Sequence, residues 1–544
     1  MKAIASILFR YAILFGILST CVSISFAQNA DVVNPACERL TQLQISNAIV
    51  TVAQTAPAGT FSGPAEVFTG RDLSGLYKTL PAFCRVEVAA KPTSDSNIKI
   101  ALWLPLAGWN GRLQGFGNGG FAGALDYGQM GAALKLGYAA VATDAGHAGS
   151  AGDASWAVGH PEKVIDFGYR GIHEMTRVSK IIVQSFYGNP AKHSYFAGCS
   201  DGGREALMEA QRYPEDYNGI LAGDPSNNWT PLISLAVYDT QVLTADPASY
   251  IPPAKLPAIT AAVNAACDEL DGVRDGILND PRKCQFDPTT IQCKAGEDSE
   301  KCLTTPQVTA LKKIYAGLPD SSGHIIFPGY LPGAEDAAGG WGMWITGPAP
   351  KLSVVYFLGN AFYGYFVHGS GDWDYKTFTV EKDEKLAENT IGPELDASDP
   401  DLKPFESRGG KLIIYHGWND PAIPALNSVN YFESVQAKLG VKATDSFLRL
   451  YMVPGMLHCI GGPGPDIFGQ MGIFTNADAR NNVRLSLQQW AEGGAAPGTI
   501  IASKHDRTDW HVTMTRPLCP YPQAAKYKGT GDTNGAANFV CSEK

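Results

Sequence analysis

Short apolar segments alternate with longer amphipathic ones in the first two fifths of the chain and again near its end. The apolar segments with strand character lie at 98–105, 138–143, 195–197, 218–224, 411–415 and 447–453. A helical pattern over 166–187 leads into the third of them. This alternation predicts a mostly parallel sheet with helices on both of its faces.

The alternation stops between about 226 and 405. This segment contains proline-rich connections, closely spaced cysteines and many aromatic residues. We therefore expect one α/β domain, formed by residues 28–225 and 406–544, with residues 226–405 inserted as a lid. Residues 30–94 predict a strand-rich cap on the main sheet.

The segment around Ser200 has the order strand, tight turn, helix. The apolar run at 195–197 leads into Gly-Cys-Ser-Asp-Gly at 198–202, and a helical segment rich in Ala, Leu, Met and Glu follows. A serine on such a strained turn is held clear of the sheet, and glycines on both sides avoid a steric clash. Ser200 is therefore a candidate nucleophile, although a plain glycine-rich turn between a strand and a helix has the same local pattern.

A nucleophile of this kind needs an acid and then a histidine later in the chain, each just after a strand. Asp420 ends the turn after the apolar run at 411–415, and His458 follows the run at 447–453. Ser200, Asp420 and His458 thus form a candidate triad. The rival acid is Asp224, at the end of the 218–224 strand pattern, and the rival bases are His416, His505 and His511.

A glycine-rich loop after the 98–105 strand can supply hydrogen-bond donors to the same chemistry. It ends in Gly-Asn-Gly-Gly at 117–120, and its backbone can approach a substrate closely because glycine has no Cβ. We expect the N–H group of Gly119 or Gly120, together with that of Asp201, to form an oxyanion hole. A plain glycine turn is the alternative.

Cysteines flank two of these candidates. Cys199 directly precedes the serine and Cys459 directly follows His458, so the two sulfurs must lie close together if the triad forms. A disulfide there would link nucleophile and base; two unrelated structural cysteines are the alternative. The chain has 11 cysteines, and without Cys21 of the N-terminal segment their number is even, which suggests five disulfides in an oxidising compartment.

The N-terminal segment has the features of a secretory signal peptide. Residues 1–27 contain Lys2 and Arg10, then an apolar run at 11–18, then Ser-Phe-Ala27. The run is too short to span a bilayer, so we expect cleavage after Ala27, a secreted or periplasmic protein and no membrane anchor. The formal net charge of −10 argues against nucleic acid as a partner.

The octapeptide GCSDGGRE at 198–205, together with Asp420 and the dipeptide His458-Cys459, resembles the tannase and feruloyl esterase family, which includes the mono(hydroxyethyl) terephthalate hydrolases. The resemblance runs over essentially the whole mature chain. It implies an α/β-hydrolase fold with a large inserted lid domain and a bridge between the two cysteines of the site. Nearest-neighbour pairing and the family pattern together suggest the bridges Cys199–Cys459, Cys37–Cys84, Cys267–Cys284, Cys293–Cys302 and Cys519–Cys541.

An acidic loop lies at 267–284, inside the expected lid. Its glycine turns can bring carboxylates and carbonyl groups to a hard cation such as calcium. The spacing is not that of an EF-hand, and the residues alone favour a solvated acidic turn. The resemblance implies instead a structural calcium site held by Asp268, Asp271, Asp275 and the carbonyl groups of Val273 and Ile277.

Aromatic residues are dense at 341–344 and 356–375, where a flat phenolic acyl group can stack. The resemblance implies a secreted serine carboxylic ester hydrolase that acts on small aromatic, feruloyl-type esters without an organic cofactor. Galloyl esters of the tannase type are one alternative. A terephthalate monoester is another alternative. The free carboxylate of such a substrate suits a bidentate arginine, so the absence of arginine from 341–380 disfavours it.

An inactive secreted binding protein on the same fold is the alternative of another class. The acyl group, the alcohol and the oligomeric state are left open.

Overall fold

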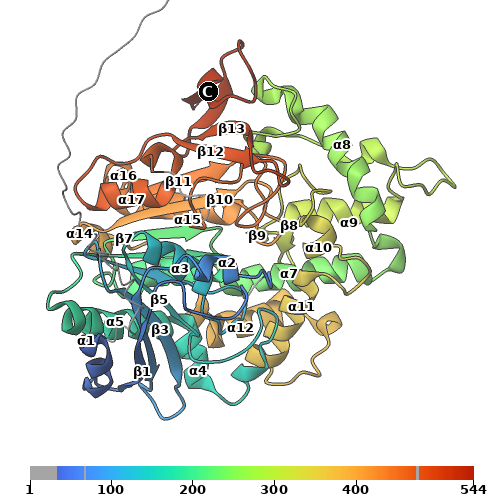
Figure 1. Ribbon diagram of the computed structural model, residues 1–544. Helices are drawn as coiled ribbons and strands as arrows, with labels where there is room; N and C mark the ends of the chain where they lie inside the picture. The colour runs from blue at the N-terminus through green and yellow to red at the C-terminus, as the bar shows by residue number, and fades with distance from the viewer. Residues whose placement is uncertain (1–33, 67–68, 473–476, 544) are drawn as a thin grey trace, which may run out of the picture.

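The computed structural model describes residues 34–66, 69–472 and 477–543 (Figure 1). The expected signal peptide, residues 1–27, lies outside the described residues. Within these ranges, no helix combines the length and the apolar character needed to cross a membrane.

A nine-stranded sheet forms the centre of the molecule. In spatial order its strands are β1 (Ala48–Ala56), β2 (Phe83–Ala90), β3 (Ile98–Pro105), β5 (Ala139–Thr143), β4 (Arg112–Phe116), β6 (His193–Cys199), β7 (Gly219–Gly223), β10 (Lys411–Gly417) and β11 (Leu448–Val453). From β5 to β11 in this order the strands run parallel to one another, whereas the pairs β1–β2, β2–β3 and β3–β5 are antiparallel. The sheet is mostly parallel, as the sequence predicts.

The N-terminal strands extend the sheet instead of capping it. β2 pairs with β3 along its whole length, from Phe83 opposite Pro105 to Ala90 opposite Ile98, and β1 forms the outer edge. The expectation of a cap is therefore wrong for these strands. Alternating burial fits both arrangements, because a strand pattern specifies which side chains are buried but not which strand is the partner.

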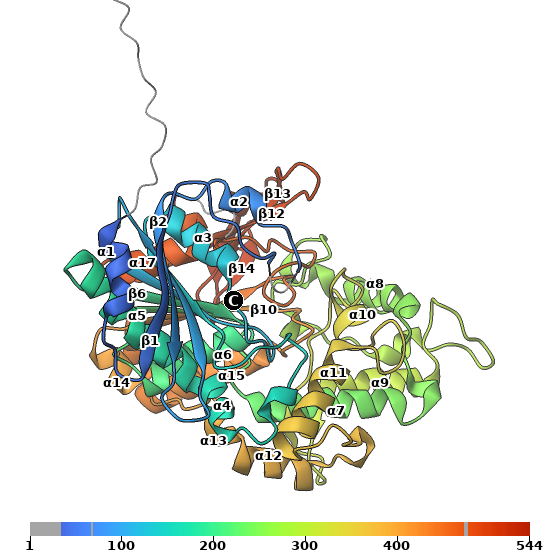
Figure 2. The ribbon, with the colours of Figure 1, turned by 60° about the horizontal axis from the view of Figure 1, so that its bottom comes forward.

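Helices cover both faces of the sheet, so the domain has three layers (Figure 2). On one face the buried sides of α5 (Gly171–Tyr187), α6 (Asp201–Arg212) and α15 (Leu426–Leu439) pack in the largest hydrophobic cluster. On the other face lie α3 (Tyr127–Lys135) and α17 (Val483–Ala491). The shorter and outer elements are α1 (Pro35–Glu38), α2 (Ser74–Tyr77), α4 (Pro161–Ile165), α16 (Val441–Phe447), β12 (Ile500–His505), β13 (Val512–Leu518), β14 (Ala524–Tyr527) and β15 (Phe539–Ser542).

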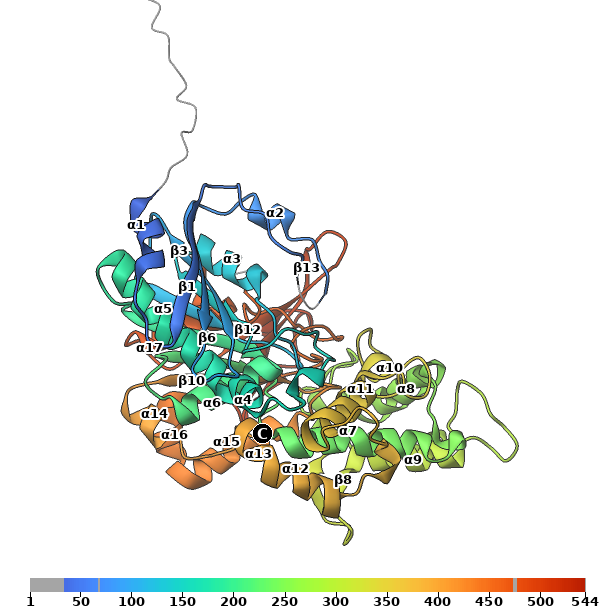
Figure 3. The same cartoon turned by 90° about the horizontal axis from the view of Figure 1, so that it is seen from below.

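The segment between β7 and β10 forms a separate, mainly helical layer beside the sheet (Figures 1 and 3). It has its own hydrophobic core, in which aromatic side chains such as Trp341, Phe362 and Tyr363 are buried. Its elements are α7 (Trp229–Thr244), α8 (Leu256–Cys267), α9 (Thr305–Ala316), β8 (Gly317–Pro319), β9 (Ile325–Pro328), α10 (Trp341–Trp344), α11 (Val354–Ala361), α12 (Lys385–Thr390) and α13 (Gly392–Leu395). The last helix before β10, α14 (Lys403–Ser407), packs instead in the core of the sheet domain through Phe405.

Disulfide bonds occur in the sheet domain, in the segment between β7 and β10 and near the C-terminus. The described cysteines pair as the sequence suggests, in the bridges Cys37–Cys84, Cys199–Cys459, Cys267–Cys284, Cys293–Cys302 and Cys519–Cys541. Cys37–Cys84 ties α1 to β2, and Cys267–Cys284 closes the acidic loop after α8. Cys199–Cys459 connects residues that are 260 positions apart in the sequence: Cys199 is the last residue of β6, and Cys459 lies in the loop after β11.

Candidate active site

Ser200 occupies the sharp turn between β6 and α6. Its backbone has φ 65° and ψ −122°, a left-handed conformation that residues with a side chain rarely adopt. A Cβ at Gly198 would lie 2.3 Å from the carbonyl oxygen of Gly202, and a Cβ at Gly202 would lie 2.9 Å from that of Asn118. Both glycines are therefore required by contacts, and the local structure is the strained elbow that the sequence predicts.

Asp420 and His458 meet where β10 and β11 end. The Nδ1 atom of His458 lies 2.8 Å from Oδ2 of Asp420. The other oxygen, Oδ1, accepts the backbone N–H groups of Ala422 at 2.7 Å and Ile423 at 3.0 Å, which fixes the carboxylate. With its Nδ1–H donated to Asp420, the imidazole keeps Nε2 available as a proton acceptor.

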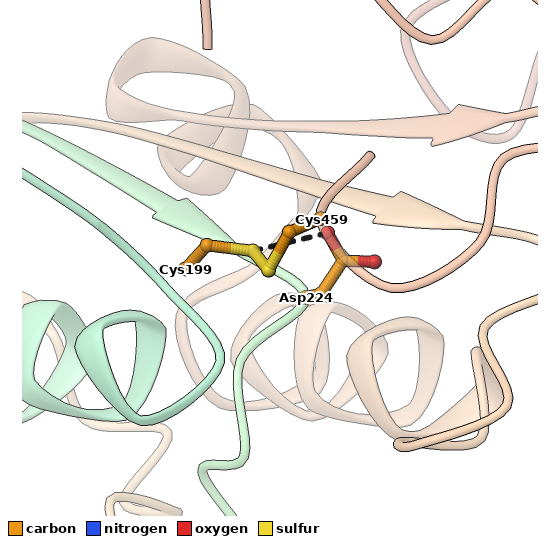
Figure 4. Close-up of side chains that lie close together, drawn as sticks. All are labelled: Cys199, Asp224 and Cys459. Carbon is orange, nitrogen blue, oxygen red and sulfur yellow. Dashed lines mark hydrogen bonds between the residues drawn. A yellow bond between two sulfur atoms is a disulfide. The ribbon is translucent and has the colours of Figure 1, made fainter. Parts of the chain in front are cut away.

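The Cys199–Cys459 bridge joins the segments that carry Ser200 and His458 (Figure 4). The Cα atoms of the two cysteines are 6.0 Å apart, so the residues next to them are held close together. Asp224 Oδ2 lies 3.4 Å from the sulfur of Cys199. Because a disulfide sulfur carries no hydrogen, this is a packing contact and not a hydrogen bond.

The charges around the acid and the base favour proton transfer. Burial works against the charged form of Asp420, but the attraction of His458 and hydrogen bonds from two histidines lower its pKa below the ordinary value. Burial likewise works against a charged His458, yet the negative charge of Asp420 outweighs it and raises the pKa of the imidazole. Asp420 is thus suited to stabilise a protonated His458.

Asp224 and His416, the rival acid and base, have other partners. Asp224 Oδ1 accepts a backbone N–H from β10 at 2.8 Å, and burial raises the pKa of its carboxyl to about 7. The Nε2 atom of His416 lies 3.0 Å from the carbonyl oxygen of Ile423 and 3.3 Å from Oδ2 of Asp420. Because a carbonyl oxygen can only accept a hydrogen bond, Nε2 of His416 carries the proton. His416 is therefore a donor toward Asp420 and not a proton acceptor at this nitrogen. The imidazole that contacts Asp420 most closely is that of His458.

The remaining rival histidines have other partners, although His505 also lines the cavity that contains Ser200 and His458. His505 contacts Ser503 Oγ at 2.9 Å and the carbonyl oxygen of Trp510 at 2.8 Å. His511 is exposed and pairs with Asp509 at 2.5 Å. Neither of these contacts includes Asp420.

Ser200, His458 and the glycine-rich loop line one cavity of about 1640 Å³. Its lid side is largely apolar, and the ring of His458 contacts Trp344 edge-on with the ring centroids 5.1 Å apart. The Phe, Tyr and Trp side chains that line the cavity are those of Phe121, Trp229, Trp344, Phe357, Tyr365 and Trp510. Charged groups, among them Lys135, Asp153, Lys504 and Arg507, line other parts of the cavity. The cavity can therefore hold a flat apolar group together with a polar one.

Gly119 and Gly120 form part of the cavity wall that Ser200 also lines. The backbone amides on either side of them, those of Asn118 and Phe121, donate to a carboxylate and to a backbone carbonyl. Among the described residues, no backbone carbonyl accepts a hydrogen bond from the N–H group of Gly119 or of Gly120. Asp201 is the first residue of α6, where a backbone N–H has no partner within the helix. These amides are the candidate oxyanion donors.

The acidic loop at 267–284 offers oxygen donors that suit calcium in chemistry. Asp268 accepts the N–H of Gly276 at 3.0 Å, and Asp271 accepts that of Asn279 at 3.0 Å. Burial, with the nearby negative charges, raises the pKa of Asp271 to about 6. Asp275 pairs with Arg516 at 2.5 Å. Among the described residues these aspartates do not gather into a compact carboxylate cluster.

Sequence reasoning did not single out the buried Glu205, and it considered His416 only as a rival base. Glu205 binds Asn118 of the glycine-rich loop, and His416 contacts the candidate acid besides being a rival base. Glu205 ends the octapeptide that carries the family resemblance, and this was the signal available in the sequence.

The fold and the site define the class. A mostly parallel sheet, a serine on a strained strand-to-helix elbow, and an acid and a histidine after later strands are the features of an α/β-hydrolase. The chain belongs to the tannase and feruloyl esterase family, whose model matches residues 84–542.

Individual relatives agree with this assignment. The chain is 37% identical over 551 residues to an uncharacterized esterase of Xanthomonas campestris pv. campestris, covering 96% of this chain and 94% of that protein. It is 34% identical over 465 residues to a probable feruloyl esterase B of Aspergillus clavatus, covering 84% of this chain and 86% of that protein. The crystal structure of feruloyl esterase B from Aspergillus oryzae matches with a TM-score of 0.84 and 30% identity, covering 93% of this chain and 99% of that one. The protein is accordingly a carboxylic ester hydrolase of the feruloyl esterase and tannase type.

Proposed function

We propose that the protein is an exported serine esterase that cleaves esters of aromatic acids of the feruloyl type. The observation that carries the proposal is the 2.8 Å contact between His458 Nδ1 and Asp420 Oδ2 in the cavity that Ser200 also lines. The aromatic wall on the lid side supports an aromatic acyl group, and the names of the relatives favour feruloyl esters.

The reaction begins with attack of Ser200 Oγ on the ester carbonyl carbon. His458 Nε2 takes the hydroxyl proton, while Asp420 holds the imidazole in the required tautomer and stabilises its positive charge. The N–H groups of Asp201 and of Gly119 or Gly120 receive the negative oxygen of the tetrahedral intermediate.

Collapse of the intermediate breaks the bond to the alcohol, which leaves with the proton from His458. The acyl group is now an ester of Ser200. His458 then deprotonates a water molecule that attacks this ester, and a second tetrahedral intermediate releases the carboxylic acid and restores the serine hydroxyl. One ester and one water thus give one acid and one alcohol, and no step requires an organic cofactor.

Two further properties belong to the proposal. Five disulfides and the N-terminal pattern of residues 1–27 support export to an oxidising compartment. A calcium ion would have a structural role at Asp268, Asp271 and Asp275, with the carbonyls of Val273 and Ile277, where it would offset the negative charge of the loop.

Hydrolysis of methyl ferulate and methyl gallate, measured side by side, tests this function. The blank is Ser200→Ala, which keeps the fold but lacks the attacking oxygen. We expect a Ser200-dependent rate that is higher on methyl ferulate. A higher rate on methyl gallate would assign the tannase alternative. Absence of any Ser200-dependent rate on either ester, in folded and disulfide-bonded protein, would contradict the proposal and favour the binding-protein alternative.

A further inference from the structure

Glu205 lies on α6, and its carboxyl group is buried against the glycine-rich loop. Its Oε2 accepts the backbone N–H of Asn118 at 2.8 Å, and its Oε1 accepts the side-chain amide of Asn118 at 3.1 Å. The carbonyl oxygen of Asn118 in turn accepts the N–H of Gly202 at 2.9 Å. Three hydrogen bonds therefore join the loop to the helix that begins beside the nucleophile.

The packing around these bonds is tight. A Cβ at Gly117 would lie 2.6 Å from the Cα of Gly202 and 2.7 Å from Oε2 of Glu205. Asn118 is 4% exposed and Glu205 is 1% exposed, so water does not compete for their hydrogen bonds. The loop and the start of α6 are thus held at one fixed spacing.

The candidate oxyanion donors lie on these two segments. Gly119 and Gly120 follow Asn118 directly, and Asp201 is the first residue of α6. Arg204 binds the Asp201 carboxylate at 2.7 Å and is itself anchored on two backbone carbonyl groups. The donor on the helix is therefore as firmly placed as the donor on the loop.

We propose that Glu205 is a positioning residue that sets the distance between the two N–H donors of the oxyanion hole. The proposal rests on the esterase function proposed above. Oxyanion donors bind the charge that develops in the transition state, so a change in their spacing lowers kcat more than it alters KM. Glu205 acts on the reaction through Asn118.

A carboxylate suits this place because both groups of Asn118 that face it are donors. Replacing Asn118 by aspartate turns the side-chain donor into an acceptor and places two carboxyl groups against each other. Burial, with the nearby Asp201 carboxylate, raises the pKa of Glu205 to about 8, while Arg204 and the hydrogen bonds from Asn118 act in the opposite direction. Such a pair of carboxyl groups can share a proton in acid but not in alkaline solution, so the defect should grow as the pH rises. At about pH 8.5 we expect Asn118→Asp to lower kcat by about 10²-fold with KM changed less than about threefold.

A second substitution in the same chain should restore the lost activity. In the Asn118→Asp/Glu205→Gln double variant, the glutamine oxygen accepts the backbone N–H of residue 118 and its NH₂ group donates to the new carboxylate. The number of hydrogen bonds and the net charge are those of the original pair. We expect kcat to recover to within about tenfold of the unmodified enzyme. Glu205→Gln alone should have a smaller effect than Asn118→Asp, because Asn118 can rotate its amide to face the glutamine.

The matched control is Glu209→Gln combined with Asn118→Asp. Glu209 is the next buried carboxyl group along α6, and it faces Asp216 instead of the loop. This combination should show no recovery of kcat. Where Asn118→Asp does not fold, Asn118→Ala removes only the two side-chain bonds, to Glu205 and from the N–H of Ala124, and should lower kcat by about tenfold.

The outcomes separate this proposal from the esterase function. An unchanged kcat in folded Asn118→Asp at alkaline pH would overturn it, as would equal kcat values for the Glu205→Gln and Glu209→Gln combinations. In both cases the Ser200-dependent rate of the unmodified enzyme would still stand. If that rate is itself missing, it is the proposed function that fails.

Discussion

Replacing Cys199 and Cys459 together by alanine tests whether their bridge orders the active site or only stabilises the fold. The bridge has a sequence separation of 260 residues, so its loss costs about 5.5 kcal/mol of stability in the chain-entropy model. With an unfolding entropy of roughly 2 cal/mol/K per residue, this corresponds to a fall in Tm of about 5 °C for a chain of this size.

The rate should fall as well, because the bridge fixes the neighbours of Ser200 and His458. The two cysteine Cα atoms are 6.0 Å apart, and Cys459 has a positive φ of 62° that the bridge helps to hold. A displacement of about 1 Å at a reacting group can cost about 10²-fold in rate. We therefore expect kcat on methyl ferulate to fall by about 10²-fold at 25 °C, where the variant remains folded.

The Cys37→Ala/Cys84→Ala variant is a control of similar stability. Its bridge has a sequence separation of 47 residues, and its loss costs about 4 kcal/mol, or about 4 °C in Tm, by the same reasoning. This bridge ties α1 to β2 near the antiparallel edge of the sheet, away from the cavity. Its removal should leave kcat unchanged. Equal losses of kcat in the two variants, or no loss in either, would refute the idea that Cys199–Cys459 orders the catalytic groups.

The acid, the base and the calcium loop give three further predictions. Asp420→Asn should lower kcat by about 10³- to 10⁴-fold, whereas Asp224→Asn should cost less than about tenfold; initial rates in which Asp224→Asn is the more damaging change would reverse the choice of acid. Because Asp420 outweighs burial and raises the pKa of His458 above its ordinary value of 6.5, kcat/KM should decline as the pH falls through a midpoint above 6.5; a pH–rate profile with a lower midpoint would contradict this electrostatic account. Dialysis against a chelator should lower Tm, added calcium should restore it, and Asp271→Asn should abolish the response; a Tm that ignores the chelator would remove the calcium proposal.

Local patterns were sufficient to predict the elements of the site. The apolar run before Ser200 and the glycines around it specify a strand and a strained turn, since contacts at Gly198 and Gly202 leave no room for a Cβ. The runs before Asp420 and His458 likewise predicted β10 and β11. In each case the information lies within a few residues of the feature.

Contacts between distant segments could not be predicted in the same way. The pairing of β2 with β3 depends on which strand would otherwise form the edge of the main sheet. An alternating pattern of apolar and polar residues does not encode this. The bonds between Glu205 and Asn118 join residues 87 positions apart. Glu205 shares its helix with other charged residues, among them Arg204 and Glu209, so the sequence does not show which of them contacts the loop. Its partner is set by the close approach of Gly117 to Gly202.

The order of the strands explains why the sequence offered rival catalytic groups. β7, β10 and β11 are parallel neighbours, so the turns after them meet at one edge of the sheet. Asp224, Asp420 and His458 each follow one of these strands, and His416 lies within β10; all four must therefore come together whatever their roles. Which carboxylate serves the base is decided by the turn. Two backbone amides hold the Asp420 carboxylate with Oδ2 toward His458, whereas Asp224 is held toward the backbone of β10. Acidic residues that follow strands thus indicate which edge of the sheet contains the candidate active site. Which of these acids pairs with His458 depends on the geometry of the turn.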